Sequence, residues 1–110
     1  MDVQQMQDLI KVLLDPGADI GARDDAAMDL HEADDPQARR ALLSVASDQR
    51  TPWIVLASAG ESLGQIATRT GPLLSDEERA HLEPDARREY DAVSTSIAAS
   101  DSPPPSGHEG

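Results

Sequence analysis

The chain has 110 residues, the size of one small domain, and its 21 acidic residues against nine lysines and arginines give a formal net charge of −12. A field of this sign repels nucleic acid and anionic lipid and attracts basic proteins, so we expect neither nucleic-acid binding nor membrane binding. The sequence has no cysteine, which excludes disulfides, thiolate zinc sites and a cysteine nucleophile.

Composition favours helices over sheets. Only 2% of the residues are aromatic, so the core has to be built from Leu, Ile, Val, Met and many Ala, which suits closely packed helices. The N-terminal residues lack the basic region and apolar run of a signal peptide. No apolar stretch approaches the ~20 residues that span a bilayer. We therefore expect a cytoplasmic protein.

The first predicted helix covers about residues 3–14 and ends at Asp15-Pro16-Gly17. Its apolar residues recur at helical spacing and predict one buried face, formed by Val3, Met6, Ile10, Leu13 and Leu14. A second helix is expected from Asp19 to about Ala33. Its predicted inward positions are Ile20, Ala26, Ala27 and Leu30.

The third predicted helix runs from Pro36 to Ala46, because Asp35 can cap its N-terminus and proline suits the first helical position. Thr51-Pro52 shows the same arrangement and predicts the start of a central helix over residues 52–67. Two of its faces are apolar, which predicts burial on most sides. We expect Trp53, at its start, to lie in the core, with a role as a partner-binding anchor as the alternative.

The C-terminal third is more polar. Gly71-Pro72 ends the central helix, and Ser75 with Glu78 forms a capping box that opens a short helix ending near Leu82. A last helix from Pro84 is expected to bury Ala86, Tyr90, Val93 and Ile97. We therefore predict a single all-α domain over residues 1–98 and a disordered Pro/Ser-rich tail over residues 99–110.

An internal repeat relates the two halves of the region 9–67. An offset of 33 residues pairs Leu30 with Leu63. The same offset pairs Asp15 with Asp48, Ile20 with Trp53, Ala22 with Val55, Ala26 with Ala59 and Ala27 with Gly60. Each copy is an amphipathic helix followed by a break and an Ala-rich helix.

This region resembles the HEAT-like repeats of the phycobilisome-lyase type, over about two degenerate copies. Ala22-Arg23 stands where that family has Val-Arg, followed by Ala26, Ala27 and Leu30. In the second copy Val55 and Leu63-Gly64 match, whereas Leu56 replaces the arginine. The resemblance implies a short right-handed stack of antiparallel helix pairs, five to six helices in all, that presents a binding surface.

Acidic residues are concentrated in the second predicted helix and the turn after it. Residues 15–35 hold eight acids and one base. Two interpretations remain open: a solvated surface, or a docking patch for a basic protein, where charge would raise the association rate and select the partner. The candidate partner-binding residues are Asp24, Asp25, Asp29, Glu32, Asp34 and Asp35.

Enzymatic chemistry has little support. Metal-dependent members of the HEAT-like group would need several converging His-Glu pairs, and His31-Glu32 is one pair only before the tail. His81 lies among charged residues and is expected to be solvated. The serines lack a nucleophile elbow, and the chain has no phosphate-binding glycine loop. We expect no catalytic residue, no metal and no cofactor.

The sequence therefore leads to a non-enzymatic protein–protein interaction module that binds a basic partner, for example an immunity-type inhibitor of a basic toxin. The alternative is a structural or regulatory subunit that acts as a homodimer through the apolar face of the first helix. A metal-dependent enzyme is the least favoured hypothesis.

Overall fold

A computed structural model of the chain describes the backbone of residues 1–101 and the side chains of residues 1–96. Every regular element in this range is helical: α1 (Val3–Leu14), α2 (Ile20–Asp29), a 3-10 turn η1 (Leu30–Glu32), α3 (Pro36–Ala46), α4 (Trp53–Thr70), α5 (Asp76–His81) and α6 (Pro84–Asp101). The predicted all-α fold class is confirmed. Helix α6 continues past the predicted domain end at residue 98, and residues 102–110 of the predicted tail lie outside the described residues.

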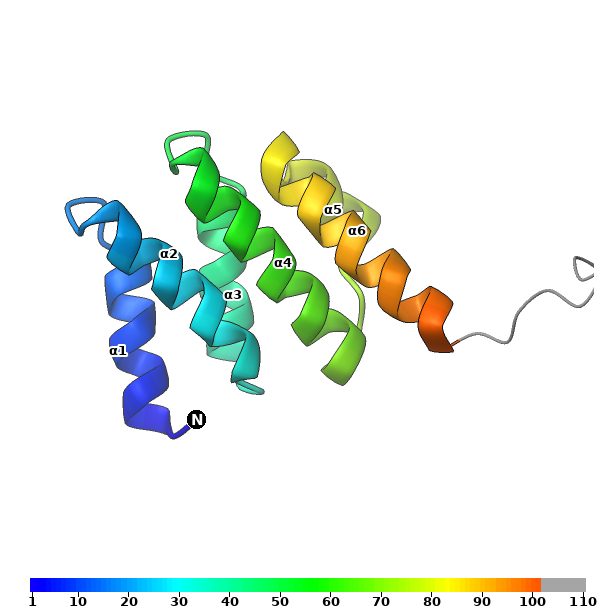
Figure 1. Cartoon of the computed structure of the whole chain (residues 1–110), viewed down its shortest axis with the longest axis horizontal. Helices are drawn as coiled ribbons and strands as arrows, with labels where there is room; N and C mark the ends of the chain where they lie inside the picture. The colour runs from blue at the N-terminus through cyan, green and yellow to red at the C-terminus, as the bar shows by residue number, and fades with distance from the viewer. Residues whose placement is uncertain (102–110) are drawn as a thin grey trace, which may run out of the picture.

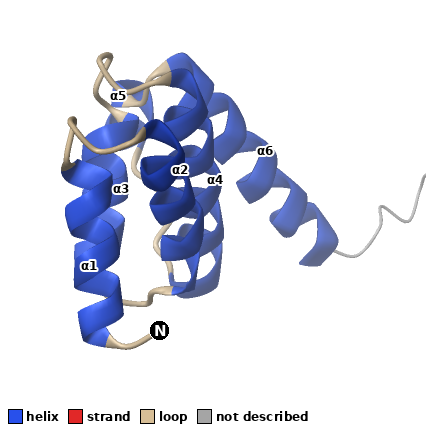
Figure 2. Ribbon diagram, turned by 60° about the vertical axis from the view of Figure 1, so that its left-hand side comes forward, coloured by secondary structure: helices blue, strands red, loops and turns tan. Residues whose placement is uncertain are grey.

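The helices form two layers. Helices α1, α3 and α5 make one layer and α2, α4 and α6 the other, so that successive helices form three pairs side by side (Figures 1 and 2). Helix α4 lies in the middle of the row and packs against α2, α3 and α6. The third pair is shortened, because α5 has six residues, none of them buried.

The core is aliphatic and is centred on α4, as predicted. Nine residues of α4 are buried, from Val55 to Ala67. Two of them are glycines that face α6: a Cβ atom at Gly60 would lie 2.1 Å from the backbone oxygen of Ala86, and one at Gly64 would lie 2.9 Å from the Cβ of Val93. The backbones of α4 and α6 therefore approach more closely than any side chain at Gly60 would allow.

Helix caps explain most of the boundaries. Asp35 accepts a hydrogen bond from the Gln37 amide at 2.8 Å, and Ser75 forms the complete capping box with Glu78, so both predicted caps are confirmed. The prediction for Thr51 was wrong: α4 begins after Pro52 and has no side-chain cap. Thr51 is buried, and its hydroxyl donates instead to the carbonyl of Val45 at 2.8 Å.

The internal repeat is visible in the two turns that join the paired helices. Asp15 accepts a hydrogen bond from the Gly17 amide at 2.8 Å, and Asp48 accepts one from the Arg50 amide at 2.9 Å. Each aspartate amide also donates to the residue three positions earlier, Val12 or Val45. The two turns therefore share the same hydrogen bonds to an aspartate, and the two aspartates are 33 residues apart, as the pairing of Asp15 with Asp48 implies.

Several apolar residues that the periodicity placed inside are exposed. Trp53 is 68% exposed and Ile20 is 51% exposed. These two residues are the first of α4 and α2. Because a helical Cα–Cβ bond tilts toward the helix N-terminus, their side chains extend beyond the start of their own helix. Val3 and Leu14, at the two ends of α1, are exposed by 60% and 45%. The expectation that these four residues are buried was wrong.

Candidate partner-binding face

The acidic segment forms α2 and η1, and α4 holds it in place. Ala26 and Ala27 face inward and are buried, so α2 lies close to α4. Two serines of α4 bridge the helices: the Ser62 hydroxyl donates to the carbonyl of Ala27, and the Ser58 hydroxyl donates to the carboxylate of Asp24. The orientation of α2, and hence which acids face solvent, is fixed by these contacts.

Three of the six predicted partner-binding acids have partners within the domain. Asp24 accepts from Ser58 and is half-buried. Asp34 forms an ion pair with Arg69, with 2.9 Å between Oδ1 and Nη2. Asp35 caps α3. These three carboxylates stabilise the fold, which makes them poor candidates for contacts with a partner.

The other three acids remain available. Asp25 and Asp29 are exposed, and no side chain among residues 1–96 donates to either of them. Glu32 is exposed as well, and its Oε2 lies 3.9 Å from Nε2 of the His31 imidazole. Asp25 and Asp29 are four residues apart on one helix, where like charges destabilise the helix by about 0.2–0.5 kcal/mol.

A shallow hollow lies between the α2–η1 segment and α4. Its volume is about 150 Å³, and it is lined by Met28 and His31 from the α2–η1 segment and by Glu61, Ser62 and Gln65 from α4. Met28 is 47% exposed; it follows Asp25 by three residues on α2 and directly precedes Asp29. We call the surface formed by Asp25, Met28, Asp29, Glu32 and Glu61 the acidic face. It joins carboxylates from two helices to an exposed apolar side chain.

The chemistry of the acidic face suits a basic partner. Lysine and arginine side chains carry an aliphatic stem and a charged head. The stem can pack on Met28 while the head lies among the carboxylates. Among the described residues, neither a lysine nor an arginine lines the hollow.

One structurally important residue was missed from the sequence. Arg23 is only 7% exposed, and its Nε donates to the carbonyl of Leu13 at 3.1 Å, at the end of α1. The equivalent carbonyl of the second repeat, that of Ala46, accepts from the backbone amide of Glu83 at 2.9 Å. The pairing of Arg23 with Leu56 could have revealed it, because the leucine indicates that the position is buried.

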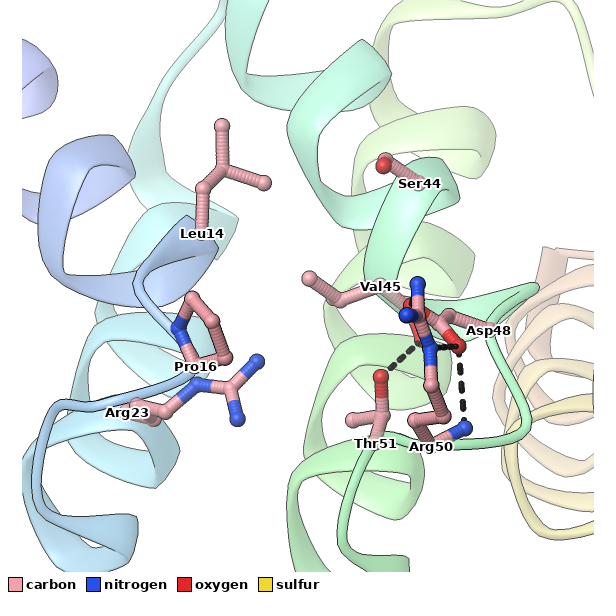
Figure 3. Close-up of a pocket in the computed structure, with 8 residues that line it drawn as sticks. All are labelled: Leu14, Pro16, Arg23, Ser44, Val45, Asp48, Arg50 and Thr51. Atoms are coloured by element: carbon pink, nitrogen blue, oxygen red, sulfur yellow. Dashed lines mark hydrogen bonds and ion pairs between the residues drawn. The ribbon is translucent and has the colours of Figure 1, made fainter.

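Arg23 borders a second hollow, between the α1–α2 turn and the α3–α4 turn (Figure 3). On the opposite wall Arg50 donates to Asp48 through Nε and Nη2, each at 3.1 Å. This contact with the Arg50 guanidinium holds the pKa of the Asp48 carboxyl below its usual value. The acidic face and this hollow are separate sites.

Other sites that the sequence raised are absent from the described residues. Among them, no group of three or more His, Asp or Glu side chains could hold a metal ion. His81 is exposed, and its Nδ1 lies 2.8 Å from the Glu77 carbonyl. No described helix is long and apolar enough to cross a membrane. No protein-family model matches the chain, and neither a curated protein nor a solved structure matches it significantly.

Proposed function

We propose that the protein is a non-enzymatic protein–protein interaction module whose acidic face binds a basic segment of another protein. One observation carries the proposal: Asp25 and Asp29 lie four residues apart on α2, where like charges are unfavourable, and no side chain among residues 1–96 pairs with either, although three other acids of the same segment have partners within the domain. A cationic partner would offset the unfavourable pairing of these two carboxylates.

The partner is defined by its chemistry. It presents lysine or arginine side chains on a surface that fits a shallow, partly apolar hollow of about 150 Å³. A basic toxin neutralised by an immunity-type inhibitor is one instance of such a partner. The repeated helix pairs and their matching turns also support our assignment of the chain to the HEAT-like repeats, which commonly act as binding modules.

Charge is expected to act chiefly on the rate of association. A protein with a net charge of −12 attracts basic partners over a distance set by the ionic strength, about 8 Å at physiological salt. The association rate constant should therefore fall as salt is raised, while the dissociation rate constant should depend mainly on the contacts at Met28 and Glu61.

The test is capture from an extract of the source cells, with elution by a salt gradient. The variant Asp25→Asn/Asp29→Asn/Glu32→Gln removes three charges from the acidic face. The matched control, Asp8→Asn/Asp76→Asn/Glu77→Gln, removes three exposed acids from α1 and α5. We expect a basic protein to be captured by the wild type and by the control, and to be lost with the first variant. Equal loss with both variants would show that only total charge matters.

Self-association is the second candidate, and the apolar residues exposed on α1 favour it. Val3 and Leu14 lie at the two ends of this helix and are exposed by 60% and 45%. Under this proposal α1 packs against its copy in a homodimer. Sedimentation equilibrium of the wild type and of Leu14→Glu tests it, because the charged side chain should shift a dimer to monomer. A wild-type monomer at all concentrations contradicts the proposal.

A further inference from the structure

The hollow between the two equivalent turns has the features of a small ligand site. It encloses about 220 Å³ and is lined by residues of both turns and of the helices that they join: Leu14, Pro16, Arg23, Ser44, Val45, Asp48, Arg50 and Thr51. In Figure 3 the guanidinium of Arg23 points from the α1–α2 side into the gap, toward the turn that carries Thr51 and Arg50.

The main evidence for a ligand site is the environment of Arg23. The residue is more than nine-tenths buried, with 7% of its surface exposed, yet only its Nε has an acceptor, the Leu13 carbonyl. No described carboxylate pairs with it: Asp48, across the gap, is bonded by Arg50 instead. No fully buried side-chain nitrogen or oxygen among the described residues lacks a hydrogen-bond partner, so the Nη groups of Arg23, which have no acceptor, are open to the hollow and its solvent. The two Nη groups therefore have donors to offer to a group that enters the hollow.

The charge of the hollow is opposite to that of the whole protein. Two guanidinium groups, of Arg23 and Arg50, face one carboxylate, that of Asp48, so the hollow has a net charge of +1. Arg50 is at the rim, with 86% of its side chain exposed. A monoanion thus meets a local positive charge within a protein whose formal net charge is −12.

We propose that this hollow binds the carboxylate of a small aliphatic acid through Arg23. A carboxylate accepts two parallel hydrogen bonds from a guanidinium, and its planar shape matches the two Nη donors. Leu14, Pro16 and Val45 supply an apolar wall for an aliphatic group. The volume of about 220 Å³ is below the ~300 Å³ at which drug-sized sites begin, so the ligand is small.

Two sources can present this chemistry: a free short-chain carboxylic acid, or the C-terminal residue of a peptide. A neighbouring hollow of about 290 Å³ lies between α1 and α3 and shares Leu14 and Ser44 with the Arg23 hollow. It leaves room for the residues that precede a terminal carboxylate. The proposal does not depend on the acidic face.

Binding is tested by nuclear magnetic resonance of the full chain, with the Nε–Hε signal of Arg23 and the methyl signals of Val45 as reporters. The probes are 4-methylpentanoate, its uncharged amide, and acetyl-Gly-Gly-Leu with either a free or an amidated C-terminus. We expect saturable shifts at both residues with the free acids and none with the amides. Tighter binding of the peptide acid than of 4-methylpentanoate identifies a chain terminus as the source, and the reverse order identifies a free acid.

Substitutions of Arg50 and Asp48 at the rim distinguish a ligand-binding role of the hollow from a structural one, because they should change ligand affinity in opposite directions. Arg50→Gln should weaken binding by about tenfold, through loss of a cation and release of Asp48 toward Arg23. Asp48→Asn keeps the Oδ1 that accepts from the Arg50 amide, and it should strengthen binding because it removes the competing carboxylate. Glu77→Gln, which changes the net charge equally on distant α5, should leave affinity unchanged.

Three results would overturn the proposal: equal shifts with acids and amides, no binding of any probe by wild-type protein or Asp48→Asn, or the same shifts with chloride at equal concentration. Thermal melting monitored by circular dichroism checks that Arg50→Gln and Asp48→Asn remain folded. Arg23→Gln should abolish binding as well, but it also removes the hydrogen bond to Leu13, so the two rim variants decide the question.

Discussion

Arg23 and Leu56 occupy equivalent positions of the repeat but have different structural roles. Leu56 fills space in the core and is 6% exposed. Arg23 is equally buried and in addition satisfies the Leu13 carbonyl at the end of α1. A helix end leaves carbonyls without helical partners, and a buried one needs a donor from elsewhere. The first repeat therefore uses an arginine where the second can use a hydrocarbon.

This difference predicts that Arg23→Leu destabilises the domain, although it restores the residue found in the second repeat. The Leu13 carbonyl would lose its donor, at a cost of about 1–3 kcal/mol. Urea denaturation followed by circular dichroism measures the effect. Arg40→Leu serves as the control, because Arg40 is exposed and should change the free energy of unfolding by less than ~0.5 kcal/mol. An equal effect of the two variants would exclude a capping role for Arg23.

Trp53 is the only tryptophan and is 68% exposed, so its fluorescence should report on solvent. We expect an emission maximum close to that of a free tryptophan and strong quenching by acrylamide in the native protein. Trp53→Ala should alter stability by less than ~0.5 kcal/mol. Leu63→Ala, in the core of the same helix, should cost about 2–5 kcal/mol. A blue-shifted emission that acrylamide leaves unquenched would place Trp53 in the core after all.

The ion pair between Arg79 on α5 and Asp91 on α6 should make stability depend on pH in the acid range. Arg79 donates to both carboxylate oxygens, and this lowers the pKa of Asp91. A lowered pKa contributes stability above the unfolded value of about 3.9, and that contribution is lost as pH falls through the folded pKa. In Asp91→Asn we therefore expect lower stability than in the wild type at pH 7, and a difference that shrinks as pH falls below about 3.9.

Thermal melting from pH 2 to 7 checks this prediction for Asp91. Both side chains are more than a third exposed, so the effect should be small and should shrink in 1 M salt. Asp8→Asn is the control, because Asp8 accepts only from the neutral amide of Gln4. A difference between wild type and Asp91→Asn that stays constant across the pH range would contradict an electrostatic origin.

At the scale of helices, the contact between α4 and α6 is closest at Gly60. A Cβ atom at Gly60 would lie 2.1 Å from the Ala86 oxygen, and backbone there can yield only if α6 moves away. Gly60→Ala should therefore destabilise the domain by about 1–3 kcal/mol, despite the higher helix propensity of alanine. Gly17→Ala is a suitable control, since a Cβ at Gly17 meets only the Asp15 carboxylate at 3.4 Å.

Calorimetry of Gly60→Ala and Gly17→Ala distinguishes the two sites. We expect a clear decrease in melting temperature for the first and little change for the second. If Gly60→Ala melts like the wild type, the close approach of α4 and α6 is not present in solution.

The sequence predicted the helices well because their ends carry local signals. Asp35 and the Ser75–Glu78 pair act within one turn of the helices that they start, so their roles can be read without knowledge of the fold. Thr51 shows that a local pattern alone does not always predict a cap. Its local pattern matches that of Asp35, but its hydroxyl bonds to Val45 in the preceding helix, which depends on how the turn folds back.

The sequence predicted the candidate site only in part, because some of its carboxylates bond to residues that are distant along the chain. The sequence identified the acidic segment and the capping role of Asp35, but it did not separate the other five carboxylates. Asp24 and Asp34 are bonded to Ser58 and Arg69, residues that lie 34 and 35 positions away. The packing of the α2–η1 segment against α4 gives these two acids their partners. The same packing brings Glu61 beside Met28, which no local pattern indicates.

At the scale of the whole molecule, α4 is enclosed and the outermost helices are not. Helix α4 has neighbours in α2, α3 and α6, whereas α1 and α6 lie at the two ends of the row (Figure 1). Such an array can open from its ends while its centre stays folded. Backbone amide hydrogens should therefore exchange with solvent deuterium in a gradient, slowest in α4 and fastest in the last turns of α6. The domain would then lose its terminal helices in separate steps, and the centre of the row would set the free energy of complete unfolding.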